Sequence, residues 1–376
     1  MATRSSSAPN APSRAIRASV SASAWARCCR RADRSPSAPA GQPRPALAGR
    51  FSLRGLQGPA FAHILIYASS TDHERRHRMT ATSKIRIGMI GVGLMGHGIA
   101  INLVRKGGYP LTLLGHAGNQ PVDDLLAAGA RQADSPAEVA RQSDVIILCV
   151  TGTPQVEDVL LKADGVLAGL QPGAIVIDCS TAIPASTLKV AEAVQKAGGR
   201  FLDAPMTRTP KEAAEGRLNL IVGGDRDLFE HCKPILQSYA ENIVHAGPIG
   251  AGHRLKLLHN YVSLGFSAVL AEAAACAERA QVDPAVLIEI LAKGGGDGVV
   301  LGRMRPYIES GDASGFRFTI SNALKDMGYY TAMAQDTGAP HEAAEAIRRT
   351  YESASRAGID QAPVPEIIEF LAGRQK

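Results

Sequence analysis

The sequence KIRIGMI-GVGLMGHGIAIN, residues 84–102, decides the fold. Its first seven residues form a short run with β-branched side chains that is typical of a strand. Helical spacing of apolar residues follows from about Gly93 to Lys106. Between the two lies the pattern G-x-G-x-x-G, at residues 91–96. A strand, this pattern and a helix, in that order, predict a dinucleotide-binding turn.

Each glycine of the turn has its own expected role. Gly91 permits the tight turn after the strand, Gly93 lets the backbone approach the pyrophosphate, and Gly96 lets the helix pack closely on the strand. The helix N-terminus then presents free N–H groups to the phosphates. We therefore expect residues 91–96, including Leu94 and Met95, to bind the cofactor.

Strand and helix patterns continue to alternate downstream of this turn. Continuous apolar runs predict further buried strands at 111–114, 144–150, 174–178, 201–204 and 218–222, with helical segments between them. The alternation predicts an α/β fold with a Rossmann-type, doubly wound and mostly parallel sheet. Strand patterns end near Gly252, and Ala, Leu and Glu at helical spacing follow. We expect a Rossmann domain at 84–246 and an all-helical C-terminal domain at 247–376.

The N-terminal stretch 1–83 differs from the rest in composition. Residues 1–78 contain thirteen Arg, no Lys and three acids, a balance of +10, whereas the other 298 residues have a balance of −4. This Arg-, Ala- and Ser-rich stretch cannot bury enough apolar surface to fold, so we expect disorder. It has the composition of an organelle transit peptide, or it precedes a true start at Met79 in a GC-rich genome. We favour the second explanation, which places the protein in the cytoplasm; the first would place it in a mitochondrial or plastid matrix.

Composition and charge narrow the class of protein. Apolar residues make up 45% of the chain and charged residues 20%, which is normal for a globular protein. No uninterrupted run of eighteen apolar residues occurs, so we expect no membrane-spanning helix. The positive charge belongs to residues 1–78 and gives no reason to expect nucleic-acid binding by the folded part. The six Cys show no metal-type spacing, and we expect no metal site.

The end of the second strand bears on the choice of cofactor. In NAD-binding proteins an acidic residue stands there and binds the ribose. Here the stretch is Gly115-His116-Ala-Gly-Asn119, without an acid. Gly115 leaves room for a phosphate and His116 could contact it. We expect NAD or NADP, with a preference for NADP.

Four further motifs follow the glycine turn in order. They are DCSTAIP at 178–184, DAPMTRT at 203–209, Gly223-Gly224, and GAGHRLKLLHN at 250–260. The ordered set resembles the β-hydroxyacid dehydrogenases, the family that includes 3-hydroxyisobutyrate dehydrogenase, over about Lys84 to Gly358. The resemblance implies an NAD(P)-dependent enzyme that interconverts a small acidic 3-hydroxy compound and its semialdehyde. Family members are generally dimers or tetramers built through the helical domain, so we expect a homodimer or homotetramer.

The resemblance also implies which residues act on the substrate. Hydride transfer to an aldehyde leaves an alkoxide that needs a proton, and Lys256 is the expected donor. Asn260, one helical turn later, would orient the substrate or Lys256. Gly252, one turn earlier, would leave this face open to the ligand. Ser263 lies on the same stripe of the helix.

Several other positions carry roles implied by the family. Ser180 and Thr181 would stand beside the nicotinamide and the substrate. The family usually has two adjacent Asn residues, and His259 replaces the first of them, which contacts the substrate in the sulfolactaldehyde enzyme. The expected cofactor contacts outside the glycine turn are Val150 and Thr151, where the family has a hydrophobic–Pro pair, together with Phe318 and Lys325.

One motif departs from the usual family pattern. Where most members have Ser-Gly-Gly, this chain has Thr207-Arg208-Thr209, which resembles the sulfolactaldehyde reductases. A guanidinium and two hydroxyls can bind a carboxylate or sulfonate, so we expect residues 207–209 to bind the anionic end of the substrate. The alternatives are a 3-hydroxyisobutyrate dehydrogenase, or a reductase of tartronate semialdehyde, succinic semialdehyde or glyoxylate. A non-catalytic cofactor-binding homologue fits less well, because Lys256 and Asn260 are both present.

Overall fold

The computed structural model describes residues 84–374. The expectation of disorder over 1–83 lies outside the described residues. In chain order the strands are β1 (Ile87–Ile90), β2 (Leu111–Leu114), β3 (Arg131–Ala133), β4 (Val145–Leu148), β5 (Ile175–Asp178), β6 (Arg200–Asp203), β7 (Met206–Thr207), β8 (Leu218–Gly223) and β9 (Ala240–Gly247). The helices of the sheet region are α2 (Leu94–Arg105), α3 (Asp123–Ala127), α4 (Pro136–Arg141), α5 (Thr153–Leu161), α6 (Val166–Gly169), α7 (Pro184–Lys196), α8 (Pro210–Glu215) and α9 (Arg226–Leu236). The later helices are α10 (Ala251–Arg279), α11 (Pro284–Ala292), α12 (Val299–Ser310), α13 (Ile320–Thr337), α14 (Glu342–Ala354) and α15 (Ile367–Ala372).

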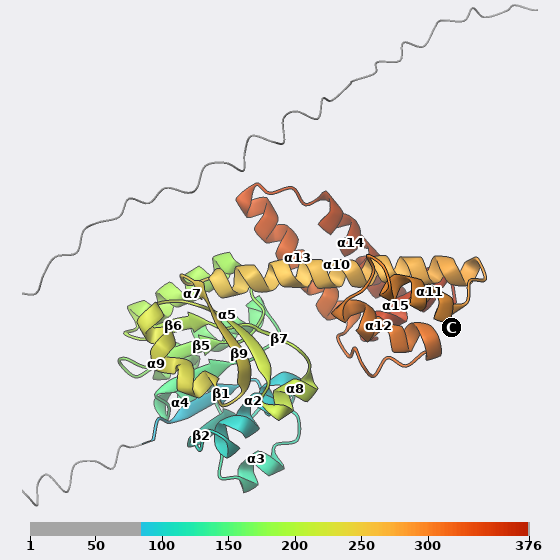
Figure 1. Cartoon of the computed structure of the whole chain (residues 1–376). Coiled ribbons are helices and arrows are strands. Elements are labelled where there is room, and N and C mark those ends of the chain that lie inside the picture. Colours follow the sequence, from blue (N-terminus) through green and yellow to red (C-terminus); the bar gives the residue numbers. More distant parts are fainter. Residues whose placement is uncertain (1–83, 375–376) are drawn as a thin grey trace, which may run out of the picture. The chain divides into compact units, whose positions relative to one another are not determined.

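The strands form one mostly parallel sheet, as the alternating pattern predicts (Figure 1). Its order is β3-β2-β1-β4-β5-β6-β8, and these pairs are parallel except for β6 with β8. β8 also pairs antiparallel with β7 and parallel with β9. The chain turns from one half of the sheet to the other between β1 and β4. In such sheets ligands bind at the carboxyl ends of the strands, near this point.

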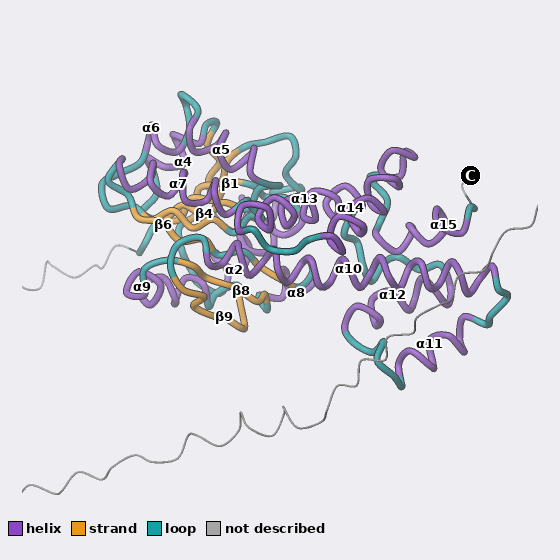
Figure 2. Tube along the Cα trace, turned by 90° about the horizontal axis from the view of Figure 1, so that it is seen from above, coloured by secondary structure: helices purple, strands orange, loops and turns teal. Residues whose placement is uncertain are grey.

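Each face of the sheet is covered by helices, which explains why the central strands are apolar throughout. Ile147 in β4 packs with residues of α2, α3 and α9 on one face, and Ile146 packs with α4, α5, α6 and α7 on the other. Figure 2 shows the strands between these two layers of helices. Continuous apolar runs such as 145–148 are therefore buried on both sides.

Three strands were not predicted from the sequence. β3 has two exposed residues of three and lies at the sheet edge, β7 has only two residues, and β9 has no continuous apolar run. Each owes its extended conformation to a neighbouring strand rather than to its own pattern. The pattern of apolar residues within a short segment does not predict with which strand that segment will pair.

Beyond Gly247 the described residues form helices around a second core, apart from one isolated bridge between Thr319 and Pro363. The central element is α10, whose 29 residues give it a length of about 44 Å. It packs against β8 and β9 near its start and against α12, α13 and α15 farther along.

Within the described residues α10 has the length and mean hydropathy (1.2) of a membrane span, although no uninterrupted apolar run marks it in the sequence. Half of the 18-residue apolar stretch of α10 is buried inside the structure, as in the core helix of a globular domain.

Candidate active site

The glycine turn has the geometry that its three expected roles require. Gly91 has a φ of +92°, and a Cβ there would lie 2.3 Å from the carbonyl oxygen of Cys149. A Cβ on Gly96 would lie 1.9 Å from the carbonyl oxygen of Gly91, so only glycine allows this approach of helix and turn. A Cβ on Gly93 would meet nothing within 4 Å. The backbone is therefore open to a ligand at the one glycine where a pyrophosphate should approach.

The N-terminus of α2 suits an anion. Its N-cap is Gly93, no side chain caps it, and its first turn holds no acidic residue. The first N–H groups of the helix are free to bind phosphate oxygens, and the helix dipole favours negative charge there. The residues present therefore fit a dinucleotide. Within the turn, Leu94 is 54% exposed, whereas Met95 packs against the core.

A residue that was not predicted braces the turn from the end of β2. The side-chain oxygen of Asn119 accepts from the Val92 N–H at 3.1 Å, and its amide donates to the Leu114 carbonyl at 2.9 Å. Gly115 and His116 lie between these anchors, and the His116 ring accepts from the Gly118 N–H at 2.9 Å. The loop expected to contact the ribose is thus tied to the loop expected to contact the pyrophosphate.

The ends of β4 and β5 meet beside this turn. The Val150 N–H donates to Ser180 Oγ at 3.1 Å, and the Ser180 N–H donates to Asp178 Oδ1 at 2.9 Å. Ser180 is buried and Thr181 half-buried. The structure brings together the predicted cofactor residue Val150 and the predicted substrate residue Ser180. It also assigns a supporting role to Asp178, which the sequence offered only as the end of a strand.

Lys256 and Asn260 lie one turn apart on α10. Lys256 is half-buried, and this burial lowers the pKa of its ammonium group to about 8. Lys325 and Arg303 lower it further, whereas Asp326 opposes them. A lysine in this range is mostly protonated at pH 7 yet can release its proton readily.

Asp326 is a site residue that the sequence analysis did not single out. The amide of the buried Asn260 donates to Asp326 Oδ2 at 2.7 Å, and its oxygen contacts His259 Nδ1 at 3.0 Å. Asp326 is 2% exposed, and its Oδ1 has no hydrogen-bond partner among the described residues, although Lys325 Nζ lies 3.3 Å away. Asp326 follows Lys325 directly in the sequence, but only Lys325 was expected to have a role in the site.

Lys325 joins the helical part to the sheet. Its Nζ donates to the carbonyl oxygen of Thr151, so two predicted cofactor residues are in direct contact. Tyr329, one turn later on α13, accepts from the Thr153 N–H at 3.1 Å. The loop after β4 is therefore held by α13, the helix that also carries Asp326.

The structure corrects the role expected for Gly252 and shows the surroundings of His259, Ser263 and Phe318. Gly252 does not leave a face open to a ligand, because a Cβ there would lie 2.3 Å from the carbonyl oxygen of Ile221; it is a packing glycine. His259 and Ser263 line an open, almost wholly apolar depression of about 480 Å³, together with Leu255, Leu258, Val262, Phe266 and Val300. Phe318 packs on the core of the helical part, and its carbonyl accepts from the Val364 N–H.

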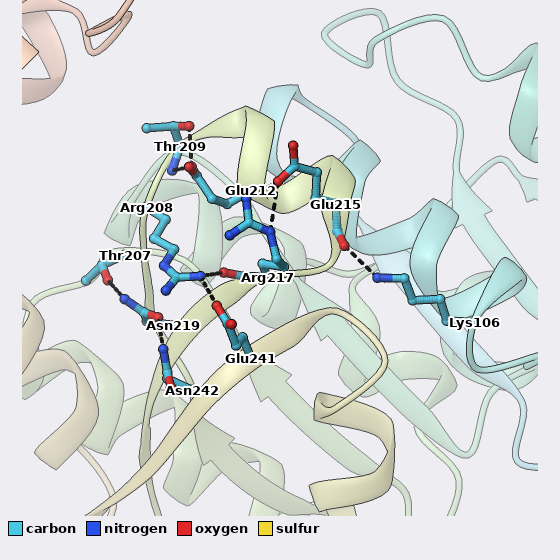
Figure 3. A network of polar contacts seen from close by, with 10 residues as sticks. All are labelled: Lys106, Thr207, Arg208, Thr209, Glu212, Glu215, Arg217, Asn219, Glu241 and Asn242. Atoms are coloured by element: carbon cyan, nitrogen blue, oxygen red, sulfur yellow. Dashed lines mark hydrogen bonds and ion pairs between the residues drawn. The ribbon is translucent and has the colours of Figure 1, made fainter.

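The loop after β7 forms a polar network of its own, shown in Figure 3. Arg208 Nη1 donates to the carbonyl oxygen of Arg217 and pairs with Glu241 of β9. Thr207 Oγ1 accepts from the Asn219 amide at 3.1 Å, and the Thr209 hydroxyl donates to Glu212 within α8. All three side chains thus have partners within the protein, and none of these contacts reaches Lys256.

The backbone at Arg208 is unusual. Its φ of +84° lies in the left-handed region, which residues other than glycine rarely adopt. This is the position where the family usually has glycine. A strained backbone is a reason to look for a function of the residue that carries it.

Comparisons with known proteins agree with this arrangement. Residues 86–247 match the NAD binding domain of 6-phosphogluconate dehydrogenase, and residues 250–371 match the family described as NAD-binding of NADP-dependent 3-hydroxyisobutyrate dehydrogenase. The chain is 34% identical to an NAD-dependent L-serine dehydrogenase of Pseudomonas aeruginosa over 69% of this chain and 86% of that protein. It is 32% identical to the 3-sulfolactaldehyde reductase of Escherichia coli over 75% of this chain and 94% of that protein.

A solved structure gives the same answer for the fold. The crystal structure of a 3-hydroxyisobutyrate dehydrogenase from Salmonella typhimurium superposes with a TM-score of 0.68 and is 27% identical, covering 76% of this chain and all of that one. Both the nicotinamide-binding sheet and the helical part that follows it are therefore shared with known dehydrogenases. The chain belongs to the β-hydroxyacid dehydrogenase family, whose members are NAD(P)-dependent hydroxyacid dehydrogenases and reductases.

Proposed function

We propose that this enzyme reduces a small anionic aldehyde to the corresponding 3-hydroxy acid, in the manner of a 3-sulfolactaldehyde reductase. The observation that carries the proposal is the half-buried Lys256, with a pKa near 8, beside the Asn260–Asp326 hydrogen bond. A bound reduced nicotinamide supplies the hydride. Lys256 then gives its proton to the oxygen that becomes the hydroxyl.

The neighbours of Lys256 suit this task. Asp326 holds the Asn260 amide, so the helix face next to the lysine is fixed before the substrate arrives. The same carboxylate raises the pKa of Lys256 and so opposes its premature deprotonation. Ser180, anchored by the Val150 N–H, offers a hydroxyl at the strand ends that could orient the aldehyde.

The anionic end of the substrate is assigned to Thr207 and Arg208. The support for Arg208 is its left-handed backbone at a position where glycine would be unstrained. In this proposal the substrate anion replaces Glu241 as the partner of the guanidinium. Arg208 is already paired with Glu241. The second candidate function is therefore a 3-hydroxyisobutyrate dehydrogenase activity in which Arg208 does not bind the substrate.

For the cofactor we propose NADP. The support is the absence of an acid from residues 115–119 and the glycine at position 115, where the atoms nearest to an added Cβ would belong to the Gln132 side chain. The relative from Pseudomonas aeruginosa is described as NAD-dependent, so the preference separates this chain from some of its relatives.

An activity screen tests the proposal. Both reduced cofactors are offered with sulfolactaldehyde, tartronate semialdehyde, succinic semialdehyde and glyoxylate, and with an uncharged aldehyde of similar size as the control. We expect turnover of one anionic aldehyde well above that of the control, and faster with NADPH. Equal turnover of charged and uncharged aldehydes would contradict the anionic substrate class.

We also propose that the enzyme is a homodimer or homotetramer assembled through the helical part. Apolar side chains of α10 are exposed, with Val262 at 69% and Val269 at 56%, and Val299 of α12 is exposed at 72%. An apolar surface of this kind is typical of a subunit interface. Light scattering of the native protein should give a multiple of the subunit mass, and a monomer at assay concentration would contradict the proposal.

A further inference from the structure

His253, in the first turn of α10, is completely buried and connects several elements of the site. Its Nε2 lies 3.1 Å from the carbonyl oxygen of Ser180, after β5. Its Nδ1 lies 2.8 Å from the hydroxyl of Thr187 in α7. Its backbone N–H donates to Asp203 Oδ2 at 2.9 Å, at the end of β6. One residue thus holds three separate segments.

The hydrogen-bond partners fix the chemistry of one ring nitrogen. A carbonyl oxygen can only accept, so Nε2 carries a proton and donates to Ser180. A leucine of similar size could not replace this bond. It would leave the Ser180 carbonyl without its buried donor, a loss that native interiors rarely tolerate.

Two buried carboxylates lie on either side of the ring. Asp178 Oδ2 is 3.9 Å from Nε2, and Asp203 Oδ2 is 3.9 Å from Nδ1. Asp178 Oδ2 has no hydrogen-bond partner among the described residues, and burial raises the pKa of this carboxyl whereas His253 lowers it. Asp203 accepts from the N–H groups of Gly250 and His253 and so caps the start of α10. The ring therefore lies between two buried carboxylates, one of which is satisfied by backbone N–H groups and the other of which has the ring as its neighbour.

We propose that His253 is a positioning residue: by tying the Ser180 loop to the first turn of α10, it sets the position of Lys256 relative to Ser180. The sequence analysis gave no role to this histidine. The proposal rests on the proposed function only for its kinetic test.

The helix transmits the position of His253 to the lysine. Residues three apart on a helix are neighbours, so a shift or rotation of the first turn moves Lys256 with it. On the other side of the ring, Ser180 Oγ accepts from the Val150 N–H in the loop after β4. The chain of contacts from Val150 through Ser180 and His253 to Lys256 therefore spans the predicted cofactor and substrate residues.

The first test compares His253→Leu with His253→Gln. The leucine removes the donor to Ser180, whereas the glutamine amide can still donate to it. A misplacement of about 1 Å can cost 10²-fold in rate, so we expect kcat to fall by roughly ten- to a hundredfold in the leucine variant and to recover largely in the glutamine variant. The Kd of the cofactor should change little in either.

His245→Leu is the matched control. His245 in β9 also bonds a carbonyl through Nε2, that of Gly224 at 2.8 Å, and packs on Phe229. This variant should lower the melting temperature but leave kcat unchanged. A normal kcat in folded His253→Leu, with only a lower melting temperature, would overturn the proposal.

A second measurement needs no substrate. Pulse acylation at a series of pH values, followed by mass spectrometry, gives the pH midpoint for labelling of Lys256. The groups that act on this lysine are Asp326 and Lys325 of α13 and Arg303 of α12, together with burial. Loosening of the first turn should hydrate the lysine and raise the midpoint by about one pH unit in His253→Leu but not in His245→Leu.

An unchanged midpoint in His253→Leu would overturn the proposal even if no substrate had been found. If the leucine variant does not fold, Thr187→Val provides the comparison, because it removes the partner of Nδ1 and leaves the imidazole in place. We then expect a smaller change of the same sign in the labelling midpoint. No change of the midpoint in Thr187→Val would contradict a positioning role.

Discussion

Replacing Arg208 with glycine removes the feature that most distinguishes this chain from its ordinary relatives. The φ of +84° is accessible to glycine at no cost, whereas a residue with a Cβ loses roughly 1–2 kcal/mol there. The lost ion pair with Glu241 contributes little to stability, because the two side chains are 25% and 49% exposed and water screens their charges. We therefore expect Arg208→Gly to keep or slightly raise the melting temperature.

The effect on activity should be much larger than the effect on stability. Hydrogen bonds to charged groups contribute roughly 1.5–3 kcal/mol each, so losing the guanidinium should lower kcat/KM for the anionic aldehyde by about ten- to a hundredfold. An uncharged aldehyde of similar size should lose little. The assay is kcat/KM for both aldehydes on the two proteins.

Glu241→Gln is the companion variant. It removes the negative charge that pairs with Arg208 and should leave unchanged or raise kcat/KM for the anionic substrate. Equal losses on charged and uncharged aldehydes in Arg208→Gly, or no loss on either, would refute the binding role of Arg208. The residue would then serve to hold β8 and β9 together, as its contacts with Arg217 and Glu241 already do.

Three further changes test other parts of the account. Deleting residues 1–78 should leave the melting temperature and kcat unchanged, since every candidate site residue lies beyond Met79; a large loss of either would contradict this. Gly115→Asp should shift the kcat/KM ratio toward NAD, because a carboxylate binds the ribose and repels a 2′-phosphate. The nearest atom to the new Cβ is Nε2 of Gln132 at 2.5 Å, so this side chain must move to make room. An unchanged ratio would show that Gly115 is not at the ribose. Asp326→Asn removes the charge that raises the pKa of Lys256, so the fall in kcat for reduction at high pH should move to lower pH. An unchanged pH profile would show that Asp326 does not influence the titration of Lys256.

The fold could be read from the sequence because its signals are local. The run at 84–90 and the glycine turn after it are strand, turn and helix within twenty residues, and the structure places them as β1 and α2. β9 could not be predicted, since its extended backbone depends on pairing with β8. A strand that is not buried on both faces carries no continuous apolar run.

The site could be predicted only where a motif carried it. Lys256 and Asn260 stand in such a motif, and the structure puts them one turn apart on α10. Asp326 and His253 depend on contacts between segments far apart in the chain, 66 residues for Asn260 with Asp326 and 73 for Ser180 with His253. The pairing of Arg208 with Glu241 has the same origin. The spacing of residues along the sequence does not predict contacts between segments so far apart.

The central claim is that Lys256 supplies the proton, and the kcat of aldehyde reduction as a function of pH, measured for the native enzyme and Lys256→Ala, tests it most directly. A proton donor with a pKa of about 8 is active in its protonated form, so native kcat should be constant at low pH and fall as the pH rises through 8. In Lys256→Ala, kcat should be lower by roughly 10²- to 10⁴-fold and show no such fall, while cofactor titration gives a nearly native Kd. A near-native kcat in the variant, or the same fall near pH 8, would contradict the assignment of Lys256 as the donor.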